Sequence, residues 1–121
     1  MLYRTAAESR EAGVTYHLVP SEVWGAANGE WYTPEAYDAD GFIHCTNGTD
    51  EIVKVGNMFY TGDPRDFLLL ELKVAQIASD WRYDVEGEVY PHIYGPLNTS
   101  AIVRELKVVR GEDGAFVDVT E

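Results

Sequence analysis

The pattern of hydrophobic positions predicts one α+β domain in which short helices come early and strands come late. Five segments have the β-branched, aromatic or continuously apolar composition of strands. They are residues 14–19, 42–46, 67–72, 81–85 and 101–109. The run from Phe67 to Leu72 is too continuous for a half-exposed strand, so we expect it at the centre of the sheet. Because strands and helices do not alternate regularly, a mainly antiparallel sheet is expected.

Capping residues indicate where the helices begin and end. Ser21 is expected to cap a short helix that ends at the Asn28-Gly29 pair. Thr33, followed by proline and glutamate, is expected to cap a second helical turn that ends at Asp40. Thr49 begins the best helix, in which apolar residues recur every three to four positions.

The remaining segments set the expected boundaries of the domain. Residues 1–12 are polar with little periodicity, which predicts an N-terminal extension followed by a single domain over residues 13–121. Residues 111–114 predict a hairpin turn before a last strand over residues 115–119. The stretch between residues 87 and 100 holds prolines and glycine and is expected to be irregular, as many functional loops are.

The charge balance and the single cysteine limit the partners and the compartment. Asp and Glu number 21 against 9 Lys and Arg, which gives a net charge of −12. We therefore expect no binding to nucleic acid and none to a membrane surface, because both need clustered basic residues. Cys45 has no partner for an intrachain disulfide, and no apolar leader is evident, so a cytoplasmic protein is expected. The oligomeric state stays open.

All three histidines lie in short apolar and aromatic motifs. His17, His44 and His92 each occupy a predicted strand or its flank, which predicts one shared, concave site. Taken singly, each could instead be a hydrogen-bonded wall residue. A metal site built from the three and a carboxylate is a weaker alternative, because their separations fit no local ligand motif. We therefore expect no metal.

Alternation along residues 42–46 separates two chemical groups. Phe42, His44 and Thr46 are expected on one face, whereas Ile43 and Cys45 point to the other. The Cys45 thiol is therefore predicted to be a small core group and not a nucleophile beside His44.

Five motifs in order resemble one family. They are residues 16–20 with Trp24, residues 41–46, the Phe59-Tyr60 pair, the leucine-rich strand at residues 67–72, and residues 91–98. Over residues 14–117 the chain resembles the bacterial domain-of-unknown-function family 952, whose fold is similar to that of ADP-ribosyltransferases. The resemblance implies a split, mainly antiparallel β-sheet with short helices and a cleft for a nicotinamide dinucleotide. The dinucleotide would then be a substrate, and no cofactor is identified.

The resemblance also implies parts for individual residues. His17 is similar to the histidine that holds the nicotinamide ribose, and His44 to the residue that stacks on the nicotinamide, while His92 has no counterpart in that pattern. Because all three are expected to line one cleft, His17, His44 and His92 are the expected catalytic residues. The expected ligand-binding residues are Thr46, Tyr94, Asn98, Trp24 and Arg82.

Two functions follow from these residues. The first is an enzyme of ADP-ribosyltransferase type that binds or transforms a nicotinamide dinucleotide or an ADP-ribose-like ligand. Its pyrophosphate would need donors, for which Arg65, Arg82 and Arg104 are the candidates. The alternative is a catalytically inactive module that binds a small ligand or a partner. It is favoured by the lack of a matching motif around the candidate glutamates, which are Glu71, Glu86, Glu88 and Glu105.

Overall fold

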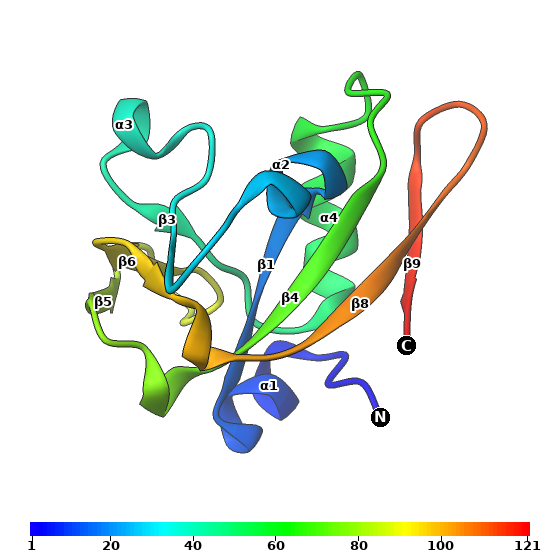
Figure 1. Ribbon diagram of the computed structural model, residues 1–121. Coiled ribbons are helices and arrows are strands. Elements are labelled where there is room, and N and C mark those ends of the chain that lie inside the picture. Colours follow the sequence, from blue (N-terminus) through cyan, green and yellow to red (C-terminus); the bar gives the residue numbers. More distant parts are fainter.

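A computed structural model, which describes residues 1–121, contains three antiparallel sheets and four short helices. The largest sheet has the strand order β1 (Val14–Pro20), β4 (Phe67–Lys73), β8 (Ile102–Arg110) and β9 (Phe116–Thr120). A three-stranded sheet has the order β3 (Ile43–His44), β6 (Pro91–Tyr94) and β5 (Asp80–Tyr83). The third sheet pairs β2 (Trp31–Tyr32) with β7 (Leu97–Asn98). Figure 1 shows the large sheet crossing the molecule diagonally, with the three-stranded sheet at its side. The predicted α+β class with mainly antiparallel sheets is confirmed.

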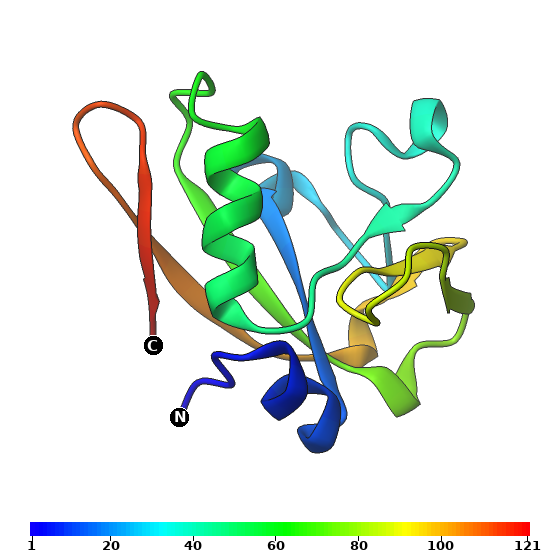
Figure 2. The ribbon, with the colours of Figure 1, turned by 180° about the vertical axis from the view of Figure 1, so that it is seen from behind.

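The helices are α1 (Ala6–Ala12), α2 (Ser21–Ala26), α3 (Tyr37–Asp40) and α4 (Thr49–Phe59). Two single 3₁₀ turns, Val74–Gln76 and Thr99–Ala101, connect strands. Seen from behind, α4 lies across the large sheet (Figure 2). It packs there because its apolar stripe, which includes the buried Ile52, faces the sheet. The prediction that this helix begins at Thr49 is confirmed.

Three local predictions are corrected by the structure. The stretch between residues 87 and 100 is not irregular, since it holds β6 and β7. Thr33 does not cap a helix, because α3 begins only at Tyr37. Ser21 is the first residue of α2, and Pro20 precedes it as the cap. The strands β6 and β7 form through pairing with distant segments, since β6 pairs with β3 and β5, and β7 pairs with β2.

The expected N-terminal extension contains a helix that packs on the domain. Thr5 and Glu8 form a capping box at the start of α1, each side chain bonding the other's backbone N–H. Ser9 is buried, and its hydroxyl donates to the Val14 carbonyl at 2.6 Å. The domain boundary at residue 13 stays a prediction, although α1 is tied to β1.

The two larger sheets meet where β1 passes the end of β3. Tyr16 and Thr46 form an isolated antiparallel bridge, with backbone N–H to O distances of 3.0 and 2.8 Å. Because neighbouring residues on a strand face opposite ways, this bridge sets the directions of His17 and His44.

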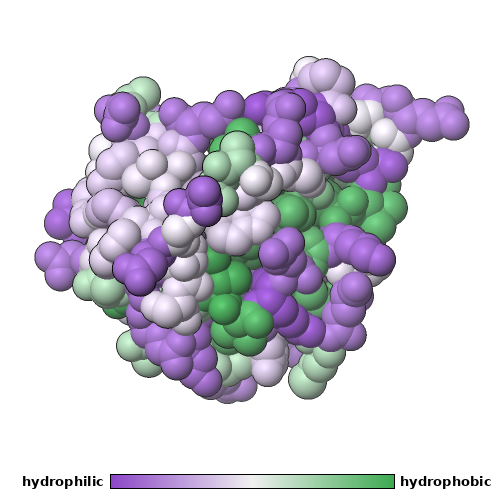
Figure 3. All heavy atoms as spheres, viewed as in Figure 1, coloured by the Kyte–Doolittle hydropathy of each residue, from purple (hydrophilic) through white to green (hydrophobic).

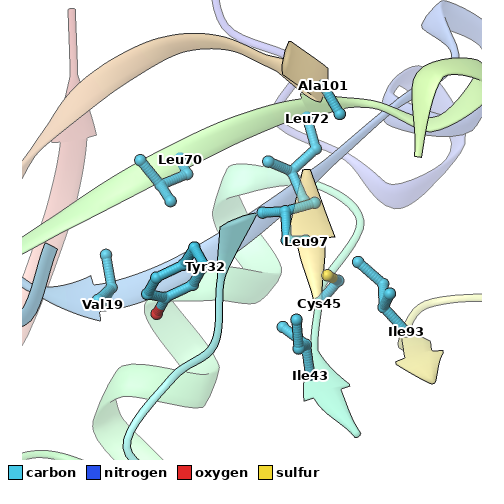
Figure 4. Packing of buried hydrophobic residues seen from close by; sticks show 9 residues of the cluster. All are labelled: Val19, Tyr32, Ile43, Cys45, Leu70, Leu72, Ile93, Leu97 and Ala101. Atoms are coloured by element: carbon cyan, nitrogen blue, oxygen red, sulfur yellow. The ribbon is translucent and has the colours of Figure 1, made fainter. Parts of the chain in front are cut away.

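The core consists of two buried clusters on opposite faces of the large sheet. One lies toward the smaller sheets, and Figure 4 shows its side chains. Its buried members are Val19, Tyr32, Ile43, Cys45, Leu70, Leu72, Ile93, Leu97 and Ala101. The other lies beneath α4, and its buried members are Val14, Tyr16, Ile52, Leu69, Leu106 and Val119. β4 lies between β1 and β8 and contributes to both clusters, as its continuous apolar run predicted.

The surface is mixed in character. Figure 3 shows hydrophilic residues around much of one face and a hydrophobic area toward its middle. No helix has the length and apolar composition needed to cross a membrane. The expectation that the acidic chain avoids nucleic acids and membrane surfaces stays a prediction.

Candidate functional site

Two adjoining cavities lie between α4, the large sheet and β3. The first, of about 140 Å³, is lined by His17, Tyr32 and Arg65 among others. The second, of about 480 Å³, is lined by His92 and by apolar residues of α4. Residues common to both walls are Asp40, His44, Thr46, Val55 and Tyr60. We call the two cavities together the histidine cleft.

His17 on β1 forms part of the floor of the cleft and is only 4% exposed. Its Nδ1 donates to the His44 carbonyl oxygen at 2.7 Å, since a carbonyl can only accept. The Nε2 then accepts from the Tyr32 hydroxyl at 2.9 Å. Burial lowers the pKa of His17 to about 4, so the ring is neutral at pH 7.

His44 on β3 presents its ring to the cleft, with 55% of the side chain exposed. Its Nε2 lies 2.8 Å from an Asp40 carboxylate oxygen at the end of α3. The Phe42 ring lies 4.6 Å from the His44 ring, measured between centroids. Thr46 is buried and lines both cavities. The predicted grouping of Phe42, His44 and Thr46 on one side of the strand agrees with these contacts.

His92 on β6 lies directly across from His44 in the strand register. The two ring centroids are 5.6 Å apart, and the rings meet edge to face at 72°. Phe42 stacks on His92 at 4.0 Å with an angle of 18° between the planes. The structure thus brings all three predicted histidines to one cleft. That they bind or transform a ligand stays a prediction.

Asp84, just beyond β5, gathers the polar groups beside His92. It accepts hydrogen bonds from the Tyr94 hydroxyl, from Arg82 Nε at 2.8 Å and from His92 Nδ1 at 2.9 Å. These bonds, led by that of Tyr94, lower the pKa of Asp84 well below its usual range. The Arg82 guanidinium also lies over the Tyr94 ring, 4.2 Å from its centroid. Arg82 and Tyr94 therefore adjoin the cleft through Asp84 and do not line its cavities.

Arg65 is the basic residue in the cleft wall, and carboxylates occupy its guanidinium. It bonds Asp63 at 2.8 Å, Glu35 at 3.0 Å and Glu22 at 3.3 Å. Asp40 adds another carboxylate to the same cavity. The cleft therefore carries a local excess of negative charge.

Several predicted residues lie outside the cleft. Trp24 packs edge-on against the Tyr32 ring, with centroids 5.4 Å apart, and lines neither cavity. Asn98 uses its amide for the backbone, donating to the Gln76 carbonyl at 2.9 Å and accepting from Ala78 N–H at 2.8 Å. Both are explained by packing and turn geometry. None of the four candidate glutamates lines the cleft either.

Sequence analysis missed the two aspartates that hold His44 and His92. Asp84 lies two residues after Arg82, so alternation along the strand could have placed both on one face. Asp40 was assigned only to the end of a helical turn, and its bond to His44 needs the turn at Gly41 to be known.

Cys45 is buried, as predicted. It is 2% exposed, and burial raises the pKa of its thiol. Figure 4 shows its sulfur within the core cluster, beside Ile93 and Leu97.

We expect the Cys45 thiol to be unreactive in the folded protein, because only the thiolate attacks disulfide reagents and burial disfavours it. Reaction with 5,5′-dithiobis(2-nitrobenzoate), followed by absorbance, should proceed only as fast as the chain unfolds. As a control, the same assay in denaturant should show that the exposed Cys45 thiol does react. Rapid labelling without denaturant would contradict the burial argument.

The fold and the cleft define a small α+β protein whose antiparallel sheets enclose a histidine-lined cavity. The family model described as protein of unknown function (DUF952) matches residues 18–105, and the chain belongs to that family. No curated protein is significantly similar to it.

Solved structures share the fold. The crystal structure of protein CC0527 from Caulobacter crescentus is 24% identical, with a TM-score of 0.71 over 86% of this chain and 93% of that one. The solution NMR structure of CC0527 gives a TM-score of 0.65 at 24% identity, over 84% of this chain and 90% of that one. At this identity the likeness establishes the fold alone.

Proposed function

We propose that the histidine cleft binds the nicotinamide end of a nicotinamide dinucleotide or of a related nucleoside. The observation that carries the proposal is the buried His17 at the junction of the two sheets, bonded to the His44 carbonyl, with the His44 ring in the lining of the same cavity. The proposed likeness of the fold to that of ADP-ribosyltransferases is consistent with this site, because a split antiparallel sheet forms the dinucleotide cleft in that superfamily.

The walls suit a flat, positively charged ring. His44 and Phe42 offer aromatic faces to the cleft. The oxidised nicotinamide ring is a cation, and carboxylates from Asp40, Glu35 and Asp63 line the first cavity. A cationic ring gains both aromatic stacking and Coulomb attraction from such walls.

Phosphate groups fit the cleft less well. Arg65, the candidate donor for a pyrophosphate, is already bonded to three carboxylates. Arg104 is engaged elsewhere by Glu71. Binding energy is therefore expected to come from the nicotinamide nucleoside half of the ligand.

We expect oxidised nicotinamide dinucleotide and nicotinamide riboside to raise the melting temperature, and ADP-ribose to raise it less. A ligand selective for the folded state stabilises that state by mass action. In His17→Ala the shift should shrink several-fold in affinity terms, because the ring holds the His44 carbonyl and the Tyr32 hydroxyl in the cleft wall and both groups lose that hydrogen-bond partner. Thermal unfolding with each ligand measures this.

Cys45→Ala is the matched control. It also removes a buried side-chain group, from the lining of the second cavity, but it leaves the His17 hydrogen bonds in place. It should keep the full ligand-induced shift. If the dinucleotide, the riboside and ADP-ribose all leave the wild-type melting curve unchanged, the nucleotide hypothesis fails.

The second candidate is a binding module without turnover. The positions of the glutamates favour this candidate. Glu35 is the only glutamate in the cleft wall, and its carboxylate is engaged in an ion pair with Arg65. Ligand binding without release of free nicotinamide, followed by chromatography, would support this candidate over a transferase.

A further inference from the structure

Two aspartate–histidine pairs face each other on neighbouring strands of the three-stranded sheet. We propose that His44 and His92, positioned by Asp40 and Asp84, form a general acid–base pair that hydrolyses uncharged carboxylic esters in the second cavity. This activity lies beyond nicotinamide binding and does not depend on it.

Each aspartate fixes which ring nitrogen is free. In its neutral form His44 donates Nε2–H to Asp40, which leaves the lone pair on Nδ1. Neutral His92 donates Nδ1–H to Asp84, which leaves the lone pair on Nε2. A carboxylate that holds one nitrogen both orients the ring and stabilises its protonated form.

The two rings lie close enough to act on one substrate. Their centroids are 5.6 Å apart, and both side chains line the second cavity. Phe42 stacks on His92 and limits its rotation. The pair supplies one base and one acid when one ring is neutral and the other is protonated.

The walls of the second cavity select the class of substrate. Apart from the histidine rings, the lining has one charged group, Asp40, and its other contacts come mainly from apolar or aromatic side chains such as Val55, Met58 and Tyr90. Its volume of about 480 Å³ falls within the range of ordinary ligand sites. A phosphodiester would meet the Asp40 carboxylate with no lysine or arginine in the lining, whereas an uncharged ester with an apolar body avoids this repulsion.

Water is the nucleophile in this scheme, because Cys45, which contributes to the lining of the second cavity, is only 2% exposed and packs in the core. The neutral imidazole takes one proton from a water molecule while the oxygen of that water bonds to the carbonyl carbon of the ester. The bond to the leaving oxygen then breaks as the protonated imidazole donates its proton to that oxygen. The products are a carboxylic acid and an alcohol, and one proton passes back between the rings through solvent.

Phenyl acetate and p-nitrophenyl acetate are suitable probes, since both are small, aromatic and uncharged. The full chain is expected to hydrolyse phenyl acetate at least about 100-fold faster than free imidazole at equal concentration, within the usual range for general acid–base catalysis. His44→Gln and His92→Gln should each lower that rate tenfold or more. Glu105→Gln, an exposed change on β8, should leave it unchanged.

Comparing two esters with different leaving groups distinguishes a loss of acid catalysis from damage to the fold. p-Nitrophenolate leaves readily without a proton, whereas phenolate benefits from one. Loss of the acid should therefore slow phenyl acetate much more than p-nitrophenyl acetate, and a merely structural role would slow both equally. For the positioning residue Asp84, Asp84→Asn should shift the ¹⁵N signals of His92 away from those of a single tautomer.

Rates equal to free imidazole, or unchanged rates in both histidine variants, would overturn the proposal. Ligand-induced melting shifts measured on the same proteins keep the two functions apart. A retained dinucleotide shift without ester hydrolysis refutes only the acid–base pair, and hydrolysis without a shift refutes only the nicotinamide site.

Discussion

Between pH 7 and pH 4 the protein is expected to lose about 3 kcal/mol of unfolding free energy through His17 alone. Burial lowers the pKa of His17 from its ordinary 6.5 to about 4 in the folded state. Below pH 6.5 the unfolded chain therefore binds a proton at this position and the folded chain does not. Stability from neutral His17 is thus complete above pH 6.5, and it falls by about 1.4 kcal/mol per pH unit until pH 4.

Urea unfolding across this pH range, on the wild type and on His17→Gln, isolates the effect. Glutamine carries both a donor and an acceptor, as neutral histidine does, but it does not titrate. Carboxylates with lowered pKa values, such as Asp63 and Asp118, lose stability at lower pH in both proteins and cancel in the difference. Parallel curves for the two proteins would contradict a neutral, buried His17.

Strand periodicity explains why the sequence placed the histidines well. The period of two fixes the separation of His44 from Cys45 once residues 42–46 are taken as extended. The same rule applied to the first strand puts His17 and Val19 on one side, where both contribute to the cleft wall. These are local consequences of backbone geometry, so one sequence suffices to predict them.

Pairing between distant segments could not be predicted in the same way. β6 begins at Pro91 and ends before Gly95, and both residues disfavour strands when judged locally. Its partner β3 lies far away in the sequence, and the register that sets His44 against His92 arises only from the packed sheet. The Asp84 bond to His92 depends on that register as well.

The availability of Arg65 in the cleft could not be predicted either, because it too depends on contacts between distant segments. Arg65 was a candidate phosphate donor because basic residues are scarce in the chain. Its partners Glu22 and Glu35 come from α2 and from the loop after β2, and tertiary folding alone brings them to it. By contrast, the Thr5–Glu8 capping box is a local pattern that sequence analysis could have used to predict α1.

Glu71→Ala is expected to destabilise the fold by about 1–3 kcal/mol without weakening nicotinamide binding, because the buried Tyr16 hydroxyl loses the acceptor of its hydrogen bond. Glu71 is 3% exposed on β4 and accepts from the Tyr16 hydroxyl at 2.9 Å. Its other oxygen contacts Arg104 Nε at 3.2 Å. The carboxylate lies on the side of the sheet that carries Tyr16, away from His17. It therefore serves the fold and not a transferase reaction.

Glu105→Ala is the matched control, since Glu105 lies on the neighbouring strand opposite Leu70 with its side chain exposed. The unfolding free energy of the Glu105→Ala protein should stay within about 0.5 kcal/mol of the wild-type value, as for most surface substitutions. Urea unfolding measures both variants, and ligand titration under folding conditions tests binding. A Glu71→Ala protein that is as stable as the control but no longer binds the dinucleotide would return Glu71 to the list of catalytic candidates. Loss of stability with binding retained would remove Glu71 from the catalytic candidates.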